Sequence, residues 1–194
     1  NAHQDSCSYR RWLDLSTATA YTEYGPEGAG YLRKYYVSRD CDVMIIEISG
    51  ECDEAVSFDV EMSRDYAGKS GVTDDGLLMI SGTLDSGTDT EGVRYSAYAK
   101  VMTEGGNSGP DTDGKHICVR DADKAWIMIS AATSFFEGDD YDAAAREILK
   151  KATEGFDPDR LWEASVAAHK ELYDRVELHI ASEAAQTIPT DERL

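Results

Sequence analysis

Residues 125–136 form an uncharged stretch in a highly charged chain, with apolar side chains at both odd and even positions. In an extended strand, Ile127 and Ile129 would point to one side, and Trp126 and Met128 to the other. A strand that is apolar on both faces belongs in the middle of a layered structure. Its β-branched and aromatic residues favour a strand over a helix. We therefore predict a buried central strand that ends a β-rich region.

A short polar segment, 121–124, precedes this strand and is typical of a tight turn. Residues 117–120, directly before the turn, have strand character. The pattern therefore predicts that 117–120 and 125–136 pair with each other as a β-hairpin.

Most of the region before residue 136 alternates between apolar and polar positions. The segment 56–62 alternates most regularly, with Ser57, Asp59 and Glu61 directed to solvent and Val56, Phe58, Val60 and Met62 directed inward, as in a half-solvated antiparallel strand. Similar patterns predict strands at 10–24, 31–37, 43–49, 77–81 and 93–103. The predicted core comprises Val56, Phe58, Val60, Val93, Ala97, Ile127 and Ile129. The strand spacing, with an acidic loop at 83–92 and a polar loop at 104–114, is typical of an antiparallel sandwich.

After residue 136 the periodicity becomes helical. We expect one helix over 140–153, capped by Asp139 or Asp140 and ended by Gly155. A second helix over 158–175 begins at Asp157 and Pro158. Its apolar stripe should dock on a sheet or lie partly exposed, and the alternation at 176–180 predicts a short strand after it. The fold class predicted is mainly β, an antiparallel two-sheet, supersandwich-like β-sandwich over 3–136, followed by two helices and a short strand in 137–194.

The charge of the chain excludes some partners. It has 19 lysines and arginines against 38 aspartates and glutamates, a net charge of −19. Nucleic acids and anionic membrane surfaces would repel such a protein. No apolar run is long enough to suggest membrane insertion.

The cysteines show neither a redox nor a zinc motif. None form a pair separated by two residues, and no histidine lies at zinc-ligand spacing from Cys7, Cys41, Cys52 or Cys118. Free thiols in a reducing compartment are favoured, with disulfides left open. This favours the cytoplasm for the chain and leaves open a secreted parent.

The search for catalytic and metal-binding residues selects none. The aspartate pairs at 74–75 and 139–140 are interpreted as turn and cap residues, whereas a glycosidase needs two facing carboxylates about 5–10 Å apart. The loop 85–91 offers oxygen ligands but lacks the terminal glutamate of a calcium loop. His169 lies on an apolar helix stripe and is interpreted as an interface residue. We therefore expect no catalytic residue, no metal and no cofactor, with substrate-binding residues unassigned.

The tyrosines leave two interpretations open. Pairs of aromatic residues across β-hairpins are most often packing contacts, and an exposed sugar-stacking platform is the alternative. The tyrosines concerned are Tyr21, Tyr24, Tyr31, Tyr35, Tyr36, Tyr95 and Tyr98.

Seven short runs, taken together and in order, resemble glycoside hydrolase family 95, the α-L-fucosidases. They are YRRWLDLSTA (9–18), RKYYVS (33–38), VRYSA (93–97), ADKA (122–125), AATSF (131–135), AHKELYDRV (168–176) and PTDERL (189–194). The resemblance implies the later part of an N-terminal sandwich and a helical linker that leads to an (α/α)₆ barrel. The family keeps its catalytic acid and its asparagine–aspartate pair in that barrel, and no residue here matches those positions. We expect the chain to be a fragment, with residues 1–2 a tag remnant.

The sequence therefore predicts a non-catalytic piece of a family 95-like fucosidase that supports the catalytic barrel in glycan degradation. The implied partners are the barrel of the parent chain and, through the parent, fucosylated glycans. Two alternatives remain, a free-standing carbohydrate-binding sandwich and a protein-interaction module. An exposed coplanar aromatic pair would favour the first, and a large apolar patch on the helices the second.

Overall fold

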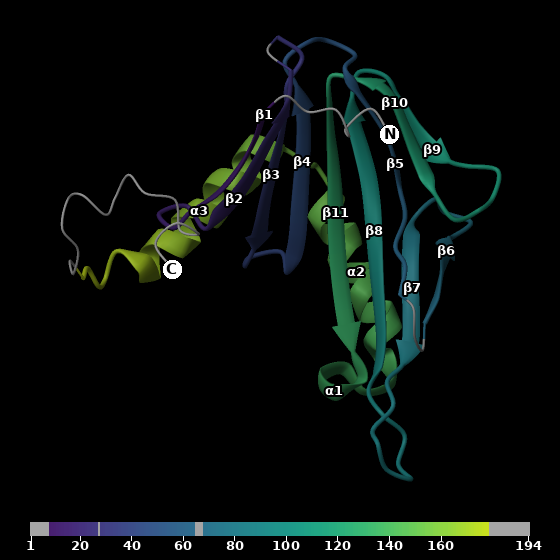
Figure 1. Ribbon diagram of the computed structural model, residues 1–194. Helices are drawn as coiled ribbons and strands as arrows, with labels where there is room; N and C mark the ends of the chain where they lie inside the picture. The colour runs from purple at the N-terminus through teal and green to yellow at the C-terminus, as the bar shows by residue number, and fades with distance from the viewer. Residues whose placement is uncertain (1–7, 27, 65–67, 179–194) are drawn as a thin grey trace.

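Two antiparallel sheets of unequal width form the body of the protein (Figure 1). The structure is a computed structural model that describes residues 8–26, 28–64 and 68–178. In the eight-stranded sheet the order is β1 (Ser8–Asp14), β2 (Thr19–Gly25), β3 (Tyr31–Ser38), β4 (Val43–Gly50), β11 (Lys124–Thr133), β8 (Arg94–Glu104), β7 (Leu78–Thr83) and β6 (Lys69–Val72). The three-stranded sheet has the order β5 (Val56–Val60), β10 (Ile117–Ala122) and β9 (Asn107–Pro110).

The strand β11 lies in the middle of the large sheet, between β4 and β8. Ala125 and Ile127 are buried between the two sheets, whereas Trp126 and Met128 are buried on the opposite face. The predicted fold class, mainly β with an antiparallel two-sheet sandwich followed by helices, is confirmed.

Two hydrophobic clusters lie on the two faces of the large sheet. The cluster between the sheets contains Val56 and Val119 from the small sheet and Leu78, Ala99 and Ile127 from the large one. The cluster on the other face joins the sheet to the helices. Of the predicted core residues, Val56 and Ile127 are buried, and the others, Phe58, Val60, Val93, Ala97 and Ile129, are partly buried.

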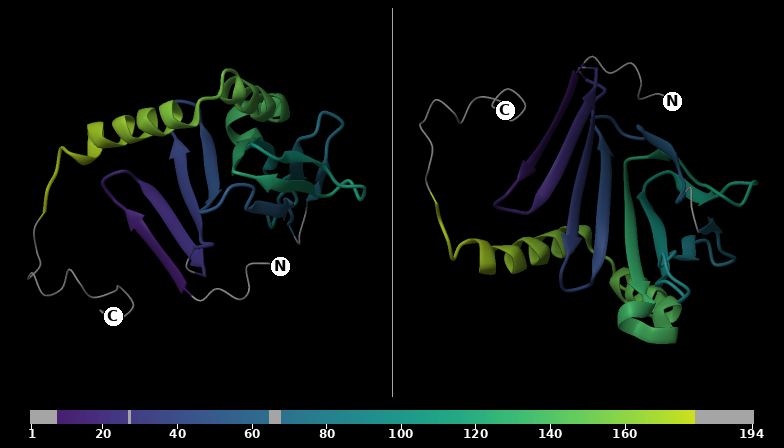
Figure 2. Two further views of the ribbon diagram at one scale, coloured as in Figure 1. Left: turned by 90° about the horizontal axis from the view of Figure 1, so that it is seen from above. Right: turned by 60° about the horizontal axis from the view of Figure 1, so that its bottom comes forward.

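Helices cover the face of the large sheet opposite the small sheet (Figure 2). A short helix, α1 (Ser134–Glu137), and a 3₁₀ turn, η1 (Gly138–Asp140), lead into α2 (Tyr141–Thr153), which packs on β8 and β11. The carboxylate of Asp142 accepts hydrogen bonds from the hydroxyls of Ser96 at 2.7 Å and Tyr98 at 2.6 Å. Leu149 of α2 is buried between the helix and the sheet. The predicted first helix is confirmed, but its predicted cap is wrong, because the Asp140 side chain makes no capping hydrogen bond and Asp139 pairs with Arg94 instead.

The second long helix, α3 (Pro158–Tyr173), is docked along only part of its length. Asp157 caps it by accepting a hydrogen bond from the amide of Arg160, as the sequence predicts. The indole N–H of Trp162 donates to the hydroxyl of Thr19 at 3.2 Å, and a ring nitrogen of His169 bonds the carbonyl oxygen of Leu15 at 2.8 Å. Beyond His169 the stripe is exposed, with Val176 80% accessible. Residues 176–178 are neither helix nor strand, and 179–180 of the predicted short strand lie outside the described residues.

The predicted hairpin between 117–120 and 125–136 is wrong. β10 pairs with β5 and β9, whereas β11 pairs with β4 and β8 in the other sheet. The segment between them is a corner at which the chain passes from the small sheet to the large one. Its polar groups form hydrogen bonds with other segments of the chain. The amide of Asp121 donates to Ser57, the amide of Asp123 donates to the carbonyl of Glu104, and the carboxylate of Asp123 accepts from the amide of Glu54. A hairpin turn and a sheet-changing corner use the same polar residues, so local pattern does not distinguish them.

The predicted single strand at 10–24 is two strands. β1 and β2 form a hairpin, and Asp14 supports the turn by accepting hydrogen bonds from the amide and hydroxyl of Ser16. Ala18 completes the reversal at a φ of 50°. Serine and threonine suit strands and turns alike, so the uncharged run at 15–20 concealed the turn.

Three further details differ from the sequence predictions. β6 and β9 are short strands in segments without clear alternation, and β9 lies inside the predicted loop 104–114. Ser134–Glu137 is helical, with Phe135 and Phe136 exposed. In β8, Ser96 and Tyr98 lie on the face opposite the predicted core residue Ala97 and are nevertheless buried, because α2 covers that face. Among the described residues, no helix is both long and apolar enough to cross a membrane.

The docking of the helices predicts unequal costs for two leucine truncations. Leu149→Ala should destabilise the protein by about 2–5 kcal/mol, because it leaves a cavity between α2 and the sheet. Leu172→Ala serves as the matched control and should cost less than about 1 kcal/mol, because Leu172 is 46% exposed. Urea unfolding of both variants measures the difference, and equal costs would contradict the partial docking of α3.

A second prediction concerns Asp142. Burial alone would raise the pKa of this carboxyl, but hydrogen bonds from Tyr98 and Ser96, together with Arg146, outweigh burial and lower it. Asp142→Ala should cost about 1–3 kcal/mol at pH 7, because two partly buried hydroxyls lose their acceptor.

The same pKa shift gives the pH dependence. A lowered folded-state pKa stabilises the protein above the unfolded value of about 3.9, and the stabilisation is lost as the pH falls through the folded pKa. The stability gap between wild type and Asp142→Ala should therefore shrink below about pH 4. Asp140→Ala is the control, because the Asp140 side chain makes no capping hydrogen bond to α2. A gap that persists unchanged at pH 3 would refute the prediction.

Candidate functional site

A groove of about 510 Å³ opens where the small sheet ends and the large sheet continues. Its floor is formed by side chains of β3, β4 and β11, and its wall by β5, with Arg120 of β10 beside it. The lining residues are Arg33, Tyr35, Ile46, Ile48, Ile127, Ser57, Phe58, Asp59, Val60 and Arg120. Its size and its mixture of apolar, aromatic and charged side chains are those of a binding pocket.

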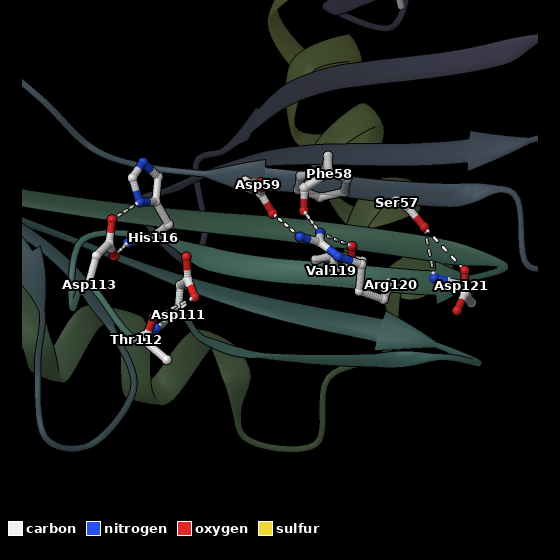
Figure 3. Close-up of polar contacts among 10 residues, drawn as sticks. All are labelled: Ser57, Phe58, Asp59, Asp111, Thr112, Asp113, His116, Val119, Arg120 and Asp121. Atoms are coloured by element: carbon white, nitrogen blue, oxygen red, sulfur yellow. Dashed lines mark hydrogen bonds and ion pairs between the residues drawn. The ribbon is translucent and has the colours of Figure 1, made fainter. Parts of the chain in front are cut away.

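An ion pair lies on the wall of this groove (Figure 3). The guanidinium of Arg120 contacts the carboxylate of Asp59 at 2.6 Å and donates hydrogen bonds to the carbonyls of Phe58 and Val119. Hydrogen bonds from Arg120 and from the thiol of Cys118 lower the pKa of Asp59. The lowered pKa favours the ionised form of Asp59, and Arg120 already pairs with it. A general acid would need a raised pKa instead.

A second charged cluster lies in the loop between β9 and β10, further along the small sheet (Figure 3). His116 places Nδ1 2.6 Å from the carboxylate of Asp113 and Nε2 3.0 Å from the carboxylate of Glu61. Its pKa is raised, first by the hydrogen bond to Asp113 and then by the charges of Asp113 and Glu61. Asp111, Asp113 and His116 have potential ligand atoms within 4.8 Å of one another.

The geometry of this cluster suits a protonated His116 ring held between carboxylates better than a histidine that acts as a base or a metal ligand. A histidine that binds a metal or removes a proton must be neutral at one ring nitrogen. Here both nitrogens face carboxylates, and the raised pKa favours the protonated ring. A metal would have to displace at least one of these ion pairs.

The aspartates considered from the sequence are engaged in local structure. Asp75 accepts a hydrogen bond from the hydroxyl of Thr73 and contacts Arg146 of α2 at 3.1 Å. Asp139 contacts Arg94 at 2.6 Å. Asp85 accepts a hydrogen bond from the amide of Gly87, within a loop that bonds to itself. The contacts of Asp75 and Asp85 agree with the turn and loop interpretations, whereas the cap interpretation of 139–140 is wrong. None of these contacts brings two of these carboxylates together.

The aromatic residues are mainly packing elements. Tyr24, Tyr36 and Tyr98 are buried. Trp12 and Tyr21 stack face to face, with ring centroids 4.9 Å apart and planes 13° apart. Rings stacked on each other do not present two coplanar faces to a sugar. His169 is hydrogen-bonded at the interface between α3 and the first hairpin, as the sequence predicts.

The sequence analysis missed the groove and both charged clusters. It placed Ser57 and Asp59 correctly on the outer face of a strand, which ends at Val60 before Glu61, but took these positions as simple solvation. Arg120 and His116 reach them from a different segment. The local sequence signal for these clusters is the alternation of charged and apolar residues along β5. This alternation does not indicate which strand pairs with β5.

The cysteines of the described residues are free thiols: Cys41, Cys52 and Cys118. Cys7 lies outside the described residues. A hydrogen bond to Asp59 and burial raise the pKa of the Cys118 thiol, which opposes the thiolate form that a nucleophile requires.

Comparison with known proteins relates the chain to carbohydrate-active enzymes. The family model described as "Glycosyl hydrolase family 65, N-terminal domain" matches residues 1–138. A curated relative, "Alpha-L-fucosidase 2" of Arabidopsis thaliana, is 25% identical over 220 aligned residues, which cover 96% of this chain and 26% of that protein. The solved structure of "Putative kojibiose phosphorylase from human microbiome" aligns with a TM-score of 0.52 and 11% identity, over 85% of this chain and 23% of that one. The chain thus spans about a quarter of the length of each of these proteins.

The His116 cluster generates a pH prediction. A raised folded-state pKa stabilises the protein below the unfolded value of about 6.5, and this stabilisation is lost as the pH rises through the folded pKa. Wild type should therefore exceed His116→Gln in melting temperature at acidic pH, and the difference should vanish at alkaline pH. Calorimetry measures this difference. NMR of the ring protons should show the pKa of His116 above its ordinary value and lowered by Asp113→Asn. An unshifted titration in wild type would contradict the ion-pair geometry.

Proposed function

Because the chain belongs to the family of glycosyl hydrolase family 65 N-terminal domains, we propose that it is a non-catalytic supporting domain of a larger glycoside hydrolase. The match over residues 1–138 carries the proposal, because it includes all the strands of both sheets. The length of the curated relative supports it, since the matching sequence makes up 26% of that protein.

The more specific proposal is that the parent enzyme is an α-L-fucosidase. The seven ordered runs that resemble family 95 support it, and so does the 25% identity to a protein named as an α-L-fucosidase. In this proposal, 137–194 forms a linker toward a catalytic barrel that supplies the acid and base. Fucosylated glycans would be bound by the parent enzyme.

The exposed C-terminal end of α3, with residues 176–178 after it, is the proposed contact with that barrel. Leu172 and Tyr173 in the last turn of α3 are 46% and 43% accessible, and Val176 and Leu178 in the non-helical segment after it are 80% and 77% accessible. A row of large apolar side chains in water is typical of a contact surface. The carbohydrate-binding alternative has weaker support, because Trp12 and Tyr21 stack on each other.

The proposal predicts that residues 1–194 alone do not hydrolyse 4-nitrophenyl α-L-fucoside. An inverting glycosidase needs an acid and a base on opposite sides of the sugar, and loss of each costs about 10²-fold or more in rate. The assay compares the purified chain with a matched blank and with the full-length parent. Asp59→Asn and Glu61→Gln test the carboxylates of the groove and of the His116 cluster, respectively. Turnover that follows the chain through a second purification, and is lost in either variant, would refute the non-catalytic role.

A further inference from the structure

A second pocket, of about 450 Å³, lies beside α2 on the face of the large sheet opposite the groove. In Figure 1, α2 runs behind β8 and β11, and β7 continues the sheet beside β8. The helix forms one wall of the pocket, and the other wall includes Leu77, directly before β7, and Lys100 of β8. A volume of this size is within the range of small-molecule sites. The pocket therefore has room for one small ligand between the helix and the sheet.

The base of this pocket is apolar. Leu149 of α2 belongs to the buried cluster between the helix and the sheet, and Leu77 packs against the same cluster. Both leucines also line the pocket, so the pocket reaches the edge of the core. An apolar group of a ligand placed against them would leave water, which is favourable.

The charged side chains around this base give the pocket the opposite sign to the rest of the chain. Three cations line it, Lys100, Arg146 and Lys150, together with two carboxylates, Asp75 and Glu147. Three positive charges against two negative ones leave the lining with a net charge of +1, whereas the whole chain has a net charge of −19. A small anion, repelled by most of this protein, is attracted here.

Both carboxylates of the lining already have cationic partners. Asp75 contacts Nη1 of Arg146 at 3.1 Å, and Glu147 contacts Lys151 of the same helix at 3.6 Å. The guanidinium of Arg146 also lies over the ring of Tyr98, 4.3 Å from its centroid. These contacts hold Arg146 at the pocket, and a guanidinium has donors beyond the one amino group that Asp75 engages.

The two lysines lack such partners. Neither Lys100 nor Lys150 forms an ion pair with another of the described residues. Lys150 is exposed, but Lys100 is partly buried, in direct register with the fully buried Met128 of β11. A charge that is partly removed from water without a counter-ion raises the free energy of the fold. An anion bound beside Lys100 would remove this cost.

We propose that this pocket binds an amphiphilic anion, a small molecule with a carboxylate or phosphate head on an aliphatic or aromatic body. The head lies among the three cations, and the body covers Leu77 and Leu149. A neutral ligand fits less well, because it leaves the charge of Lys100 unpaired. The ligand contacts both α2 and the sheet, so its binding stabilises the attachment of the helix by mass action. The proposal goes beyond the supporting role and does not depend on it.

Calorimetric titration of the chain with three matched probes tests the two halves of the ligand. Octanoate has the charge and the apolar body, octanamide has the same body without the charge, and butyrate has the same charge on a shorter body. Octanoate should bind with a Kd of about 1 mM or tighter, and at least about tenfold more tightly than either control. A parallel titration with octyl phosphate shows which anionic head binds more tightly.

Substitution of the lysines tests the site. A chain with both Lys100→Met and Lys150→Met keeps most of the length of these side chains and loses their charge. It should bind octanoate at least about tenfold more weakly and should bind octanamide no more weakly than wild type does. Lys170→Met is the control, because Lys170 lies on α3 outside the pocket, and it should leave octanoate binding unchanged. Urea unfolding verifies that each variant is folded.

NMR of the backbone amides locates the ligand. Octanoate should shift the amide signals of Ala143 and Thr153, which line the pocket, more than those of β9 in the small sheet. Equal affinity for octanoate and octanamide would overturn the proposal, and so would full binding by the double variant. Shifts centred elsewhere, or a Kd for octanoate above about 10 mM, would overturn it too. None of these readouts depends on fucosidase activity or on a larger parent, so the failure of the two proposals can be told apart.

Discussion

The burial of β11 on both faces is the constraint on which the rest of the structure depends. A strand that is uncharged after Lys124 and lies in the middle of the large sheet requires a second layer on each side, because burial of both rows of its apolar side chains is favourable. The small sheet covers Ala125 and Ile127, and α2 covers Met128 and Ser130, the hydroxyl of which donates to the carbonyl of Ala145 at 2.7 Å. The small sheet and the helical layer thus each bury one face of the same strand.

The corner at Asp121–Asp123 makes this arrangement possible. It moves the chain from the small sheet to the large one within a few residues, with Ala122 fully buried at the transition. Because its polar groups bond to Ser57, Glu54 and Glu104, it also ties together the ends of β5 and β8. A change in this corner would disturb the alignment of both layers, and with it the wall of the groove.

The unequal widths of the two sheets connect the fold to the supporting role proposed for it. Where the layers match, the molecule has a closed core. Where they do not, on β1–β4 and along the distal half of α3, apolar side chains meet solvent. A domain that supports other parts of an enzyme needs such surfaces, because each one can be buried against a neighbouring layer. The ion pairs of Arg120 with Asp59 and of His116 with Asp113 and Glu61 link β5, β10 and the loop before β10, and contribute to the order of the small sheet.

The sequence by itself determined the features that depend on local periodicity. The alternation of β5, the double-sided burial of β11, the start of α3 at Asp157 and the interface role of His169 all follow from neighbouring residues. Only the tertiary structure decided that β10 and β11 lie in different sheets, that α2 buries the Tyr98 face of β8, and that Arg120 and His116 meet the carboxylates of β5 and its end. The physical reason is that periodicity shows which side chains of a segment face water and which face the core. Which strands pair and which side chains meet depends instead on contacts between segments that are far apart in the chain. The two turns at 15–18 and 121–124 illustrate this limit, because their residues suit several chain reversals and the sheets on either side select one.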